Sequence, residues 1–104
     1  KGVIPWDKHY ENDDFLFFKD INPITKVHVL GIPKSQCVDF SDFISKSTPT
    51  KISEFFKKTN LVIEMLGITK DGYKVISNSG INGGQEVPHF HIHILGGHKV
   101  NLSN

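Results

Sequence analysis

Polar and apolar residues alternate strictly over residues 89–94, where every second residue is a histidine up to position 93. Successive side chains of a strand point to opposite faces, so this period of two predicts a half-buried strand. Its apolar face, formed by Phe90, Ile92 and Ile94, belongs against a core. The opposite face carries three imidazoles, and packing gives no reason for them to be there.

The pattern predicts four further strands before this one. Aromatic and β-branched residues form short runs bounded by Asn, Asp, Gly or Pro, which is typical of strands separated by turns. These strands are expected over residues 9–11, 15–20, 26–33 and 73–78. Pro23 ends the second of them, because proline has no N–H for a sheet ladder. Asp71-Gly72 is a turn before the fourth.

A long helix is predicted between the third and fourth of these strands. Thr48 suits its N-cap, Pro49 its first position, and Gly67 the position after its last turn. Apolar residues recur between them at helical spacing, so this helix is expected to cover the sheet. A shorter helix is predicted within 38–47, from the spacing of Phe40, Phe43 and Ile44. Neither helix is assigned any chemistry.

The composition is that of an ordinary globular protein. The chain of 104 residues suits a single domain, 1–104, with 38% hydrophobic and 22% charged residues. A net charge of +1 gives no strong field, so neither nucleic acid nor membrane is an expected partner. Cys37 is the single cysteine, and no apolar run reaches the roughly 18–20 residues of a membrane span. We expect a cytoplasmic protein.

The histidine row by itself admits three interpretations: a metal site, a catalytic site, or polar side chains without a role. Neutral imidazole is a common zinc ligand and also a catalytic base or nucleophile. The preceding loop, residues 78–85, contains three glycines. Glycine lets backbone N–H groups converge on an anion, and phosphate is the usual one. A phosphate loop beside a histidine row favours nucleotidyl transfer over a closed zinc site.

The segment His89-Phe90-His91-Ile92-His93-Ile94-Leu95 resembles the His-φ-His-φ-His-φ-φ signature of the histidine triad (HIT) superfamily, in which φ is apolar. With Gly83-Gly84-Gln85 before it and Gly96-Gly97 after it, it is similar to the Hint-like branch, the purine nucleoside phosphoramidases. The resemblance implies an α+β HIT-like fold, an antiparallel sheet of about five strands with a long and a short helix on one face. It also implies a homodimer. The family's N-terminal helix and C-terminal tail are missing or short in this sequence.

The resemblance implies catalytic roles for four histidines. His91, the middle histidine of the triad, is the expected nucleophile, which attacks the α-phosphorus and forms a nucleotidyl-histidine intermediate that water hydrolyses. Its other nitrogen must be held as a donor, and we expect a backbone carbonyl near His89 to accept from it. His89 and His28 are expected to orient the triad, although His28 is equally compatible with a polar residue at a strand start. His93 is expected to reach the phosphate oxygens.

The same resemblance implies a nucleoside site at the end of the second strand. Asp20 corresponds to the residue that binds the ribose hydroxyls, and a carboxylate suits two vicinal hydroxyl donors. The residues around Asp20 alone favour a simple turn former. Phe18 and Ile21 are expected to contact the base.

The loop before the triad is expected to contact the rest of the nucleotide. Asn78 is compatible both with this role and with holding the turn. The backbone N–H groups of Gly84, Gln85 and Glu86 are expected to bind the phosphate. Glu86 departs from the Ser or Thr of many relatives. Because a carboxylate repels phosphate and donates only when protonated, we expect its side chain to point away.

Three functional hypotheses follow. The first is a hydrolase that cleaves purine nucleoside phosphoramidates of the AMP–amine type, or related nucleotidyl conjugates, without a cofactor. The second is a nucleotide-binding regulatory protein with incidental hydrolysis, which the intact triad disfavours. The third is a zinc-binding protein that uses the three histidines, which the phosphate loop disfavours. We therefore expect no metal at the site.

Overall fold

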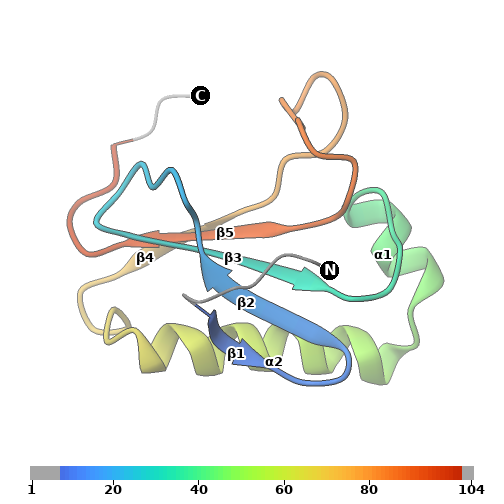
Figure 1. Cartoon of the computed structure of the whole chain (residues 1–104), viewed down its shortest axis with the longest axis horizontal. Coiled ribbons are helices and arrows are strands. Elements are labelled where there is room, and N and C mark those ends of the chain that lie inside the picture. The colour runs from blue at the N-terminus through green and yellow to red at the C-terminus, as the bar shows by residue number, and fades with distance from the viewer. Residues whose placement is uncertain (1–7, 102–104) are drawn as a thin grey trace.

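The structure, a computed structural model, describes residues 8–101 and contains one five-stranded sheet (Figure 1). The strand order is β1-β2-β3-β5-β4, and all neighbouring strands are antiparallel. The last strand of the chain therefore lies inside the sheet, between β3 and β4. The strands are β1 (Lys8–Glu11), β2 (Phe15–Lys19), β3 (Val27–Pro33), β4 (Tyr73–Ile76) and β5 (Ile92–Gly96). The predicted antiparallel sheet and the α+β fold class are confirmed.

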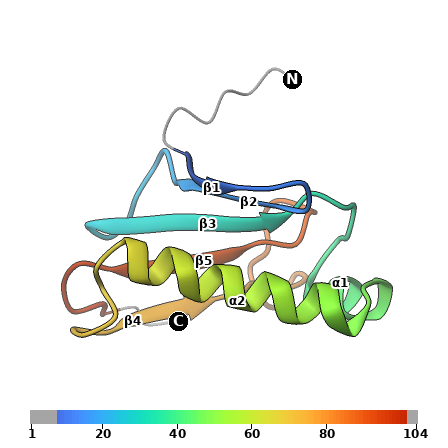
Figure 2. The same cartoon turned by 90° about the horizontal axis from the view of Figure 1, so that it is seen from below.

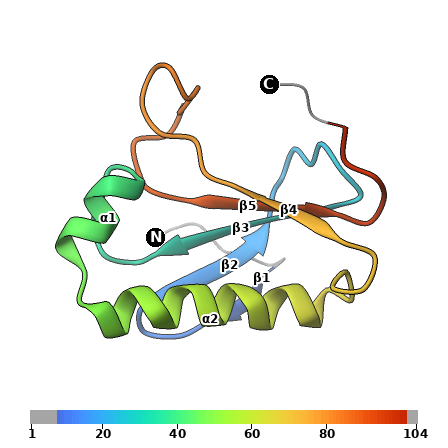
Figure 3. The same ribbon diagram turned by 180° about the vertical axis from the view of Figure 1, so that it is seen from behind.

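Helix α2 (Pro49–Met65) runs along one face of the sheet, and the shorter α1 (Phe40–Lys46) precedes it at one end (Figures 2 and 3). The N-cap is the predicted one, because Thr48 Oγ1 accepts from the Lys51 N–H at 3.1 Å. Gly67 follows the helix with a φ of 72°, as a residue in this terminating position often does. Within residues 8–101, neither helix has the length and apolar character needed to cross a membrane.

The core between α2 and the sheet is built around the ring of Phe55. Its centroid lies between 5.2 and 5.8 Å from four other phenylalanine rings, each at most 1% exposed. These rings come from β2, from α1 and from the chain just before β5, so one side chain of α2 joins three parts of the fold. They are Phe15, Phe17, Phe43 and Phe90.

A glycine in the middle of β3 makes room for this aromatic core. Gly31 pairs with Phe17 on β2, and the Phe17 ring lies across the glycine. A Cβ at position 31 would be 2.4 Å from Phe17 Cε2, which is far inside van der Waals contact. The interior strand position is therefore restricted to glycine by the neighbouring ring.

The strand with the histidines begins later than the sequence predicts. Pairing starts at Ile92, whereas residues 87–89 form a bend. Pro88 has no N–H, and the N–H of Phe90 donates to Cys37 O, before α1, at 2.8 Å. The predicted alternation nevertheless holds, with Phe90, Ile92 and Ile94 at most 2% exposed and the three histidines half-buried.

Two loops rise from the face of the sheet opposite α2 (Figure 1). One connects β2 to β3, and the other connects β4 to β5 and contains the glycines. His93 lies on this face, because Ile92 and Ile94 on either side of it enter the core beneath the sheet. The histidines and the helices thus lie on opposite faces of one sheet.

Candidate active site

The ring of His91 is held by one of its own neighbours. His91 Nδ1 lies 2.8 Å from the backbone carbonyl oxygen of His89. Because a carbonyl only accepts, the proton of the neutral ring must be on Nδ1. Nε2 then carries a lone pair. This is the arrangement that we expected for a nucleophile.

The ring of His89 is tied to the end of β3. Its Nε2 lies 2.9 Å from the carbonyl oxygen of Pro33, so this nitrogen carries the proton and donates it. His89 contacts His91 through its backbone carbonyl. Its own imidazole anchors the bend before β5 to β3, and the carbonyl that accepts from His91 is positioned with it.

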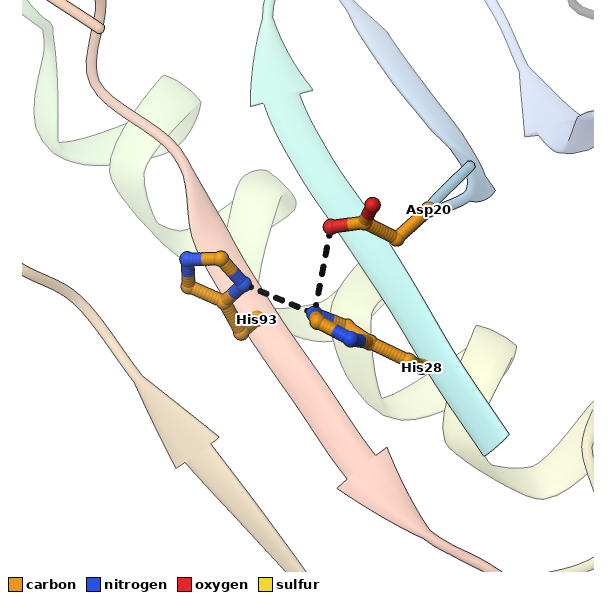
Figure 4. Close-up of side chains that lie close together, drawn as sticks. All are labelled: Asp20, His28 and His93. Atoms are coloured by element: carbon orange, nitrogen blue, oxygen red, sulfur yellow. Dashed lines mark hydrogen bonds and ion pairs between the residues drawn. The ribbon is translucent and has the colours of Figure 1, made fainter. Parts of the chain in front are cut away.

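His28 and His93 contact each other across the β3–β5 pair (Figure 4). His28 Nε2 lies 2.9 Å from His93 Nδ1 and 3.3 Å from Asp20 Oδ2. The backbone N–H of Ile24 donates to the other nitrogen of His28, Nδ1, at 3.2 Å. Nδ1 is therefore an acceptor, and the proton of the neutral His28 ring is on Nε2.

The direction of this hydrogen bond determines the tautomer of His93. Because His28 Nε2–H donates, His93 Nδ1 accepts, and the neutral His93 ring carries its proton on Nε2. His91 and His93, whose ring centroids are 5.1 Å apart, therefore hold opposite tautomers. Nε2 of His91 offers a lone pair, whereas Nε2 of His93 offers a proton.

The surroundings of His28 and His93 favour the neutral form of both rings. Burial lowers the pKa of His28, against the opposing effect of the Asp20 carboxylate. Burial also lowers the pKa of His93, to about 4, with further lowering from His91 and His28 and a partial opposing effect of Asp20. Near neutral pH, His93 is therefore a neutral hydrogen-bond donor.

We expect stability to fall with pH because of His93. In the unfolded chain its pKa is 6.5, and in the folded protein it is about 4. Between these values the unfolded state binds a proton that the folded state does not, so stability is unaffected above pH 6.5 and is lost as pH drops toward 4. The loss reaches about 2–3 kcal/mol at pH 4.5. Urea unfolding at pH 7.5 and 4.5 measures it. His93→Gln is the control, because it removes the titrating ring. Its loss of stability between the two pH values is expected to be about 2–3 kcal/mol smaller than that of the wild type. Equal losses in the two proteins would contradict the prediction.

Asp20, His28 and His93 also have the composition of a metal site, since one ligand atom from each lies within 4.8 Å of the others. A zinc ion would take the lone pair of His28 Nε2 and place the ring proton on Nδ1. The Ile24 N–H already points at Nδ1, so two donors would then face each other. The hydrogen bonding of His28 fits a donor to His93 and does not fit a zinc ligand.

The glycine loop is closed by its own hydrogen bonds. The N–H of Gly84 donates to Ile81 O at 3.1 Å, and that of Gln85 donates to Gly80 O at 3.0 Å. The Asn78 side chain donates to Gly83 O at 2.7 Å. Two of the three N–H groups predicted to bind phosphate are thus engaged within the loop. Among residues 8–101, no acceptor is bonded to the third, the Glu86 N–H.

The Gln85 side chain fastens this loop to the chain before α1. Its Oε1 accepts from the Gly80 N–H at 2.9 Å, and its Nε2 donates to Val38 O at 2.7 Å and to Val87 O at 2.9 Å. The sequence suggested that position 85 binds the nucleotide through its backbone. The structure shows a structural use of its side chain that no local pattern reveals.

The remaining predicted residues are spread around the histidine face. Asp20 is mostly buried and its Oδ1 accepts from the Asn22 N–H at 2.8 Å, so it also forms the turn that its surroundings suggest. Phe18 is half-buried, and Ile21 is 81% exposed. The side chain of Glu86 is exposed. The roles of these residues in binding stay predictions.

Two backbone groups are functional elements that sequence reasoning missed. The N–H of Ile24 fixes the His28 tautomer, and Pro33 O anchors His89. Backbone groups leave no signal in residue identity. Their proximity depends on the register of β3 against its neighbours.

A cleft of about 670 Å³ lies at the opposite end of the β3–β5 pair from His91. Its lining includes Lys26, Lys74, Lys99 and the apolar residues Leu66 and Ile68, which follow α2. None of the triad histidines lines it. The cleft is therefore separate from the candidate site at the histidines.

Several known proteins are similar to this chain in sequence and in fold. The HIT domain matches residues 1–100. An uncharacterized HIT-like protein of Helicobacter pylori is 46% identical over 99 residues, covering 95% of this chain and 91% of that protein. A HIT family hydrolase from Legionella pneumophila has a TM-score of 0.85 at 30% identity, covering 94% of this chain and 87% of its own. A histidine triad nucleotide-binding protein from Candida albicans has a TM-score of 0.74 at 25% identity, covering 97% and 79%. The chain belongs to the HIT-domain family, as its histidine signature predicts.

Proposed function

We propose that the protein is a hydrolase that cleaves purine nucleoside phosphoramidates, or related nucleotidyl conjugates, through a covalent intermediate on His91. The observation that carries the proposal is the 2.8 Å hydrogen bond from His91 Nδ1–H to His89 O. It leaves the Nε2 lone pair free and keeps the ring from rotating. A nucleophile needs both properties.

In the first step, the Nε2 lone pair of His91 forms a bond to the α-phosphorus. The phosphorus–nitrogen bond to the leaving amine breaks, and the amine departs with that electron pair and takes up a proton. In the second step, water attacks the same phosphorus and the bond to Nε2 breaks. The products are a nucleoside monophosphate, the free amine and the restored imidazole.

The charge that develops on the phosphate oxygens needs fixed donors. His93 provides one, because its Nε2–H is set by the bond from His28. The Glu86 N–H is proposed as a second. A preorganised donor of this kind typically contributes ~10²–10³ in rate.

The nucleoside is proposed to lie between the two loops above the sheet, with its ribose on Asp20 and its base against Phe18 and Ile21. The partial exposure of Asp20 and the high exposure of Ile21 are compatible with contact to a ligand. Two relatives point the same way: the protein from Legionella pneumophila is named a hydrolase, and that from Candida albicans a nucleotide-binding protein.

An adenosine 5′-phosphoramidate assay tests the proposal. We expect the wild-type protein to release AMP and the amine, and a denaturing quench at alkaline pH during turnover to trap AMP on the peptide that contains His91. Binding of AMP without turnover would favour the regulatory alternative. Release of AMP with no trapped adduct, under conditions that trap other phosphohistidines, would contradict the covalent route.

We also propose a homodimer in which a second copy extends the sheet at β4. This strand is an edge of the sheet, where backbone groups lie unpaired and can add another strand. Tyr73 and Val75 on β4 and Met65 on α2 are between 40% and 56% exposed, which leaves apolar surface beside the edge. Light scattering is expected to give twice the 11.7 kDa chain mass. Val75→Glu is expected to reduce the measured mass toward that of one chain. A wild-type protein with the mass of a monomer would contradict the proposal.

A further inference from the structure

A carboxylate lies beside the N–H of His28 that is hydrogen-bonded to His93. His28 Nε2 is 2.9 Å from His93 Nδ1 and 3.3 Å from Asp20 Oδ2 (Figure 4). The Ile24 N–H occupies the other nitrogen of His28, so the neutral ring has no second proton to offer. The proton is hydrogen-bonded to His93, and the negative charge of the Asp20 carboxylate beside it pulls against that bond.

Asp20 approaches this proton from a position that a ligand can reach. Its side chain is 18% exposed, against 4% for His28. The carboxylate is held in place, because Oδ1 accepts from the Asn22 N–H and the Asp20 N–H donates to His28 O. An ionised carboxylate has about four lone-pair sites, and the Asn22 N–H uses one of them. The remaining acceptor capacity is available to hydroxyl groups of a ligand.

We infer that hydroxyl groups of a bound nucleoside, by donating to Asp20, reduce the pull of its carboxylate on the His28 N–H. The hydrogen bond from that N–H to His93 is then strengthened, which tightens the orientation of the His93 ring. The inference rests on the proposed function, because it requires a ligand with a sugar at Asp20 and a phosphate at the triad. Asp20 and His28 are then positioning residues that act through His93. Hydroxyl donors partly neutralise the carboxylate, and the His28 N–H then points more directly at His93 Nδ1.

A consequence is that the sugar hydroxyls contribute to the chemical step as well as to binding. Contacts remote from the reacting bond raise kcat when their effect is realised only in the transition state. His93 is the link, because its Nε2–H stabilises the phosphate oxygens as charge develops on them. A ligand without hydroxyls would bind less tightly and would also react more slowly once bound.

The kinetic test measures kcat and KM separately for an adenosine phosphoramidate and its 2′,3′-dideoxy counterpart. For the wild type, we expect the dideoxy substrate to raise KM and to lower kcat about tenfold, within the usual range of coupling between sites. In Asp20→Ala, kcat is expected to be the same for both substrates, because the carboxylate through which the hydroxyl groups act is gone. Asn22→Ala is the matched control: it keeps the Asn22 N–H and Asp20, so the tenfold difference is expected to remain.

A spectroscopic test does not depend on turnover. We expect AMP to shift the ring ¹⁵N resonance of His93 Nδ1 more than 2′,3′-dideoxy-AMP does at saturation, and Asp20→Ala to abolish the difference. A dideoxy substrate that changes KM alone would overturn the inference while leaving the proposed hydrolase intact. If the protein turns over neither substrate, the proposed function fails, and the resonances decide: equal shifts from both nucleotides overturn the coupling, and unequal shifts support it.

Discussion

Replacing His91 with alanine is expected to reduce kcat for an adenosine phosphoramidate by at least about 10³-fold, because it removes the imidazole that is proposed to form the bond to phosphorus. The reason is specific to this position. Among the triad histidines, the Nδ1 proton of His91 is held by the His89 carbonyl, which leaves Nε2 unprotonated. His93 has the opposite tautomer and offers a proton there. Steady-state release of AMP measures the effect.

His9→Ala is the matched control for this variant. His9 is also a half-buried strand histidine, on β1 at the far side of the sheet order, and it has no assigned role. We expect its turnover to equal that of the wild type. AMP binding by His91→Ala, measured by calorimetry, separates lost chemistry from lost folding. A His91→Ala protein that binds AMP and retains more than a tenth of wild-type kcat would refute the assignment of the nucleophile.

The largest expected effect on stability comes from Phe55→Ala. The Phe55 ring is fully buried and contacts rings from β2, α1 and the chain before β5. Removing it leaves a cavity bordered by four rings that cannot all close inward. The expected cost is about 3–5 kcal/mol, a large part of the roughly 5–15 kcal/mol that stabilises a small domain. Urea unfolding with a common m-value measures it.

Phe56→Ala provides the control, since it makes the same chemical change one residue along the same helix. Phe56 is 38% exposed, and its ring contacts Phe55 with centroids 5.2 Å apart. We expect a loss of about 1 kcal/mol, mostly from this aromatic pair. If the two variants lost equal stability, the central place of Phe55 in the core would be wrong.

Periodicity was sufficient to predict the faces of the sheet but not the limits of pairing. The alternation at 89–94 separated buried Phe90, Ile92 and Ile94 from the histidines, as observed. It overestimated the strand because Pro88 and the bond from Phe90 N–H to Cys37 O redirect the chain before Ile92. That partner lies more than 50 residues away in the sequence, so no local pattern contains it.

The candidate site was predictable in its side chains and not in its connections. The spacing of His91 and His93 is a local property of the chain, whereas the contact of His28 with His93 depends on the β3–β5 register. The tautomers depend on backbone partners, namely the Ile24 N–H and the His89 carbonyl. The glycine loop shows the converse. Its composition suggested a binding site for anions, and its N–H groups mostly close the loop itself.

The position of β5 between β3 and β4 has a consequence for synthesis of the protein on the ribosome. Every other strand is made before β5, yet β3 and β4 have no partner along their shared side until β5 arrives. Until β5 is made, the nascent chain therefore exposes the unpaired edges of β3 and β4. Unpaired strand edges are also the surfaces most prone to aggregate. The segment that closes them brings His93 with it and follows directly after His91. Completion of the sheet and assembly of the candidate site are thus one late event, and a chain interrupted before residue 92 lacks both.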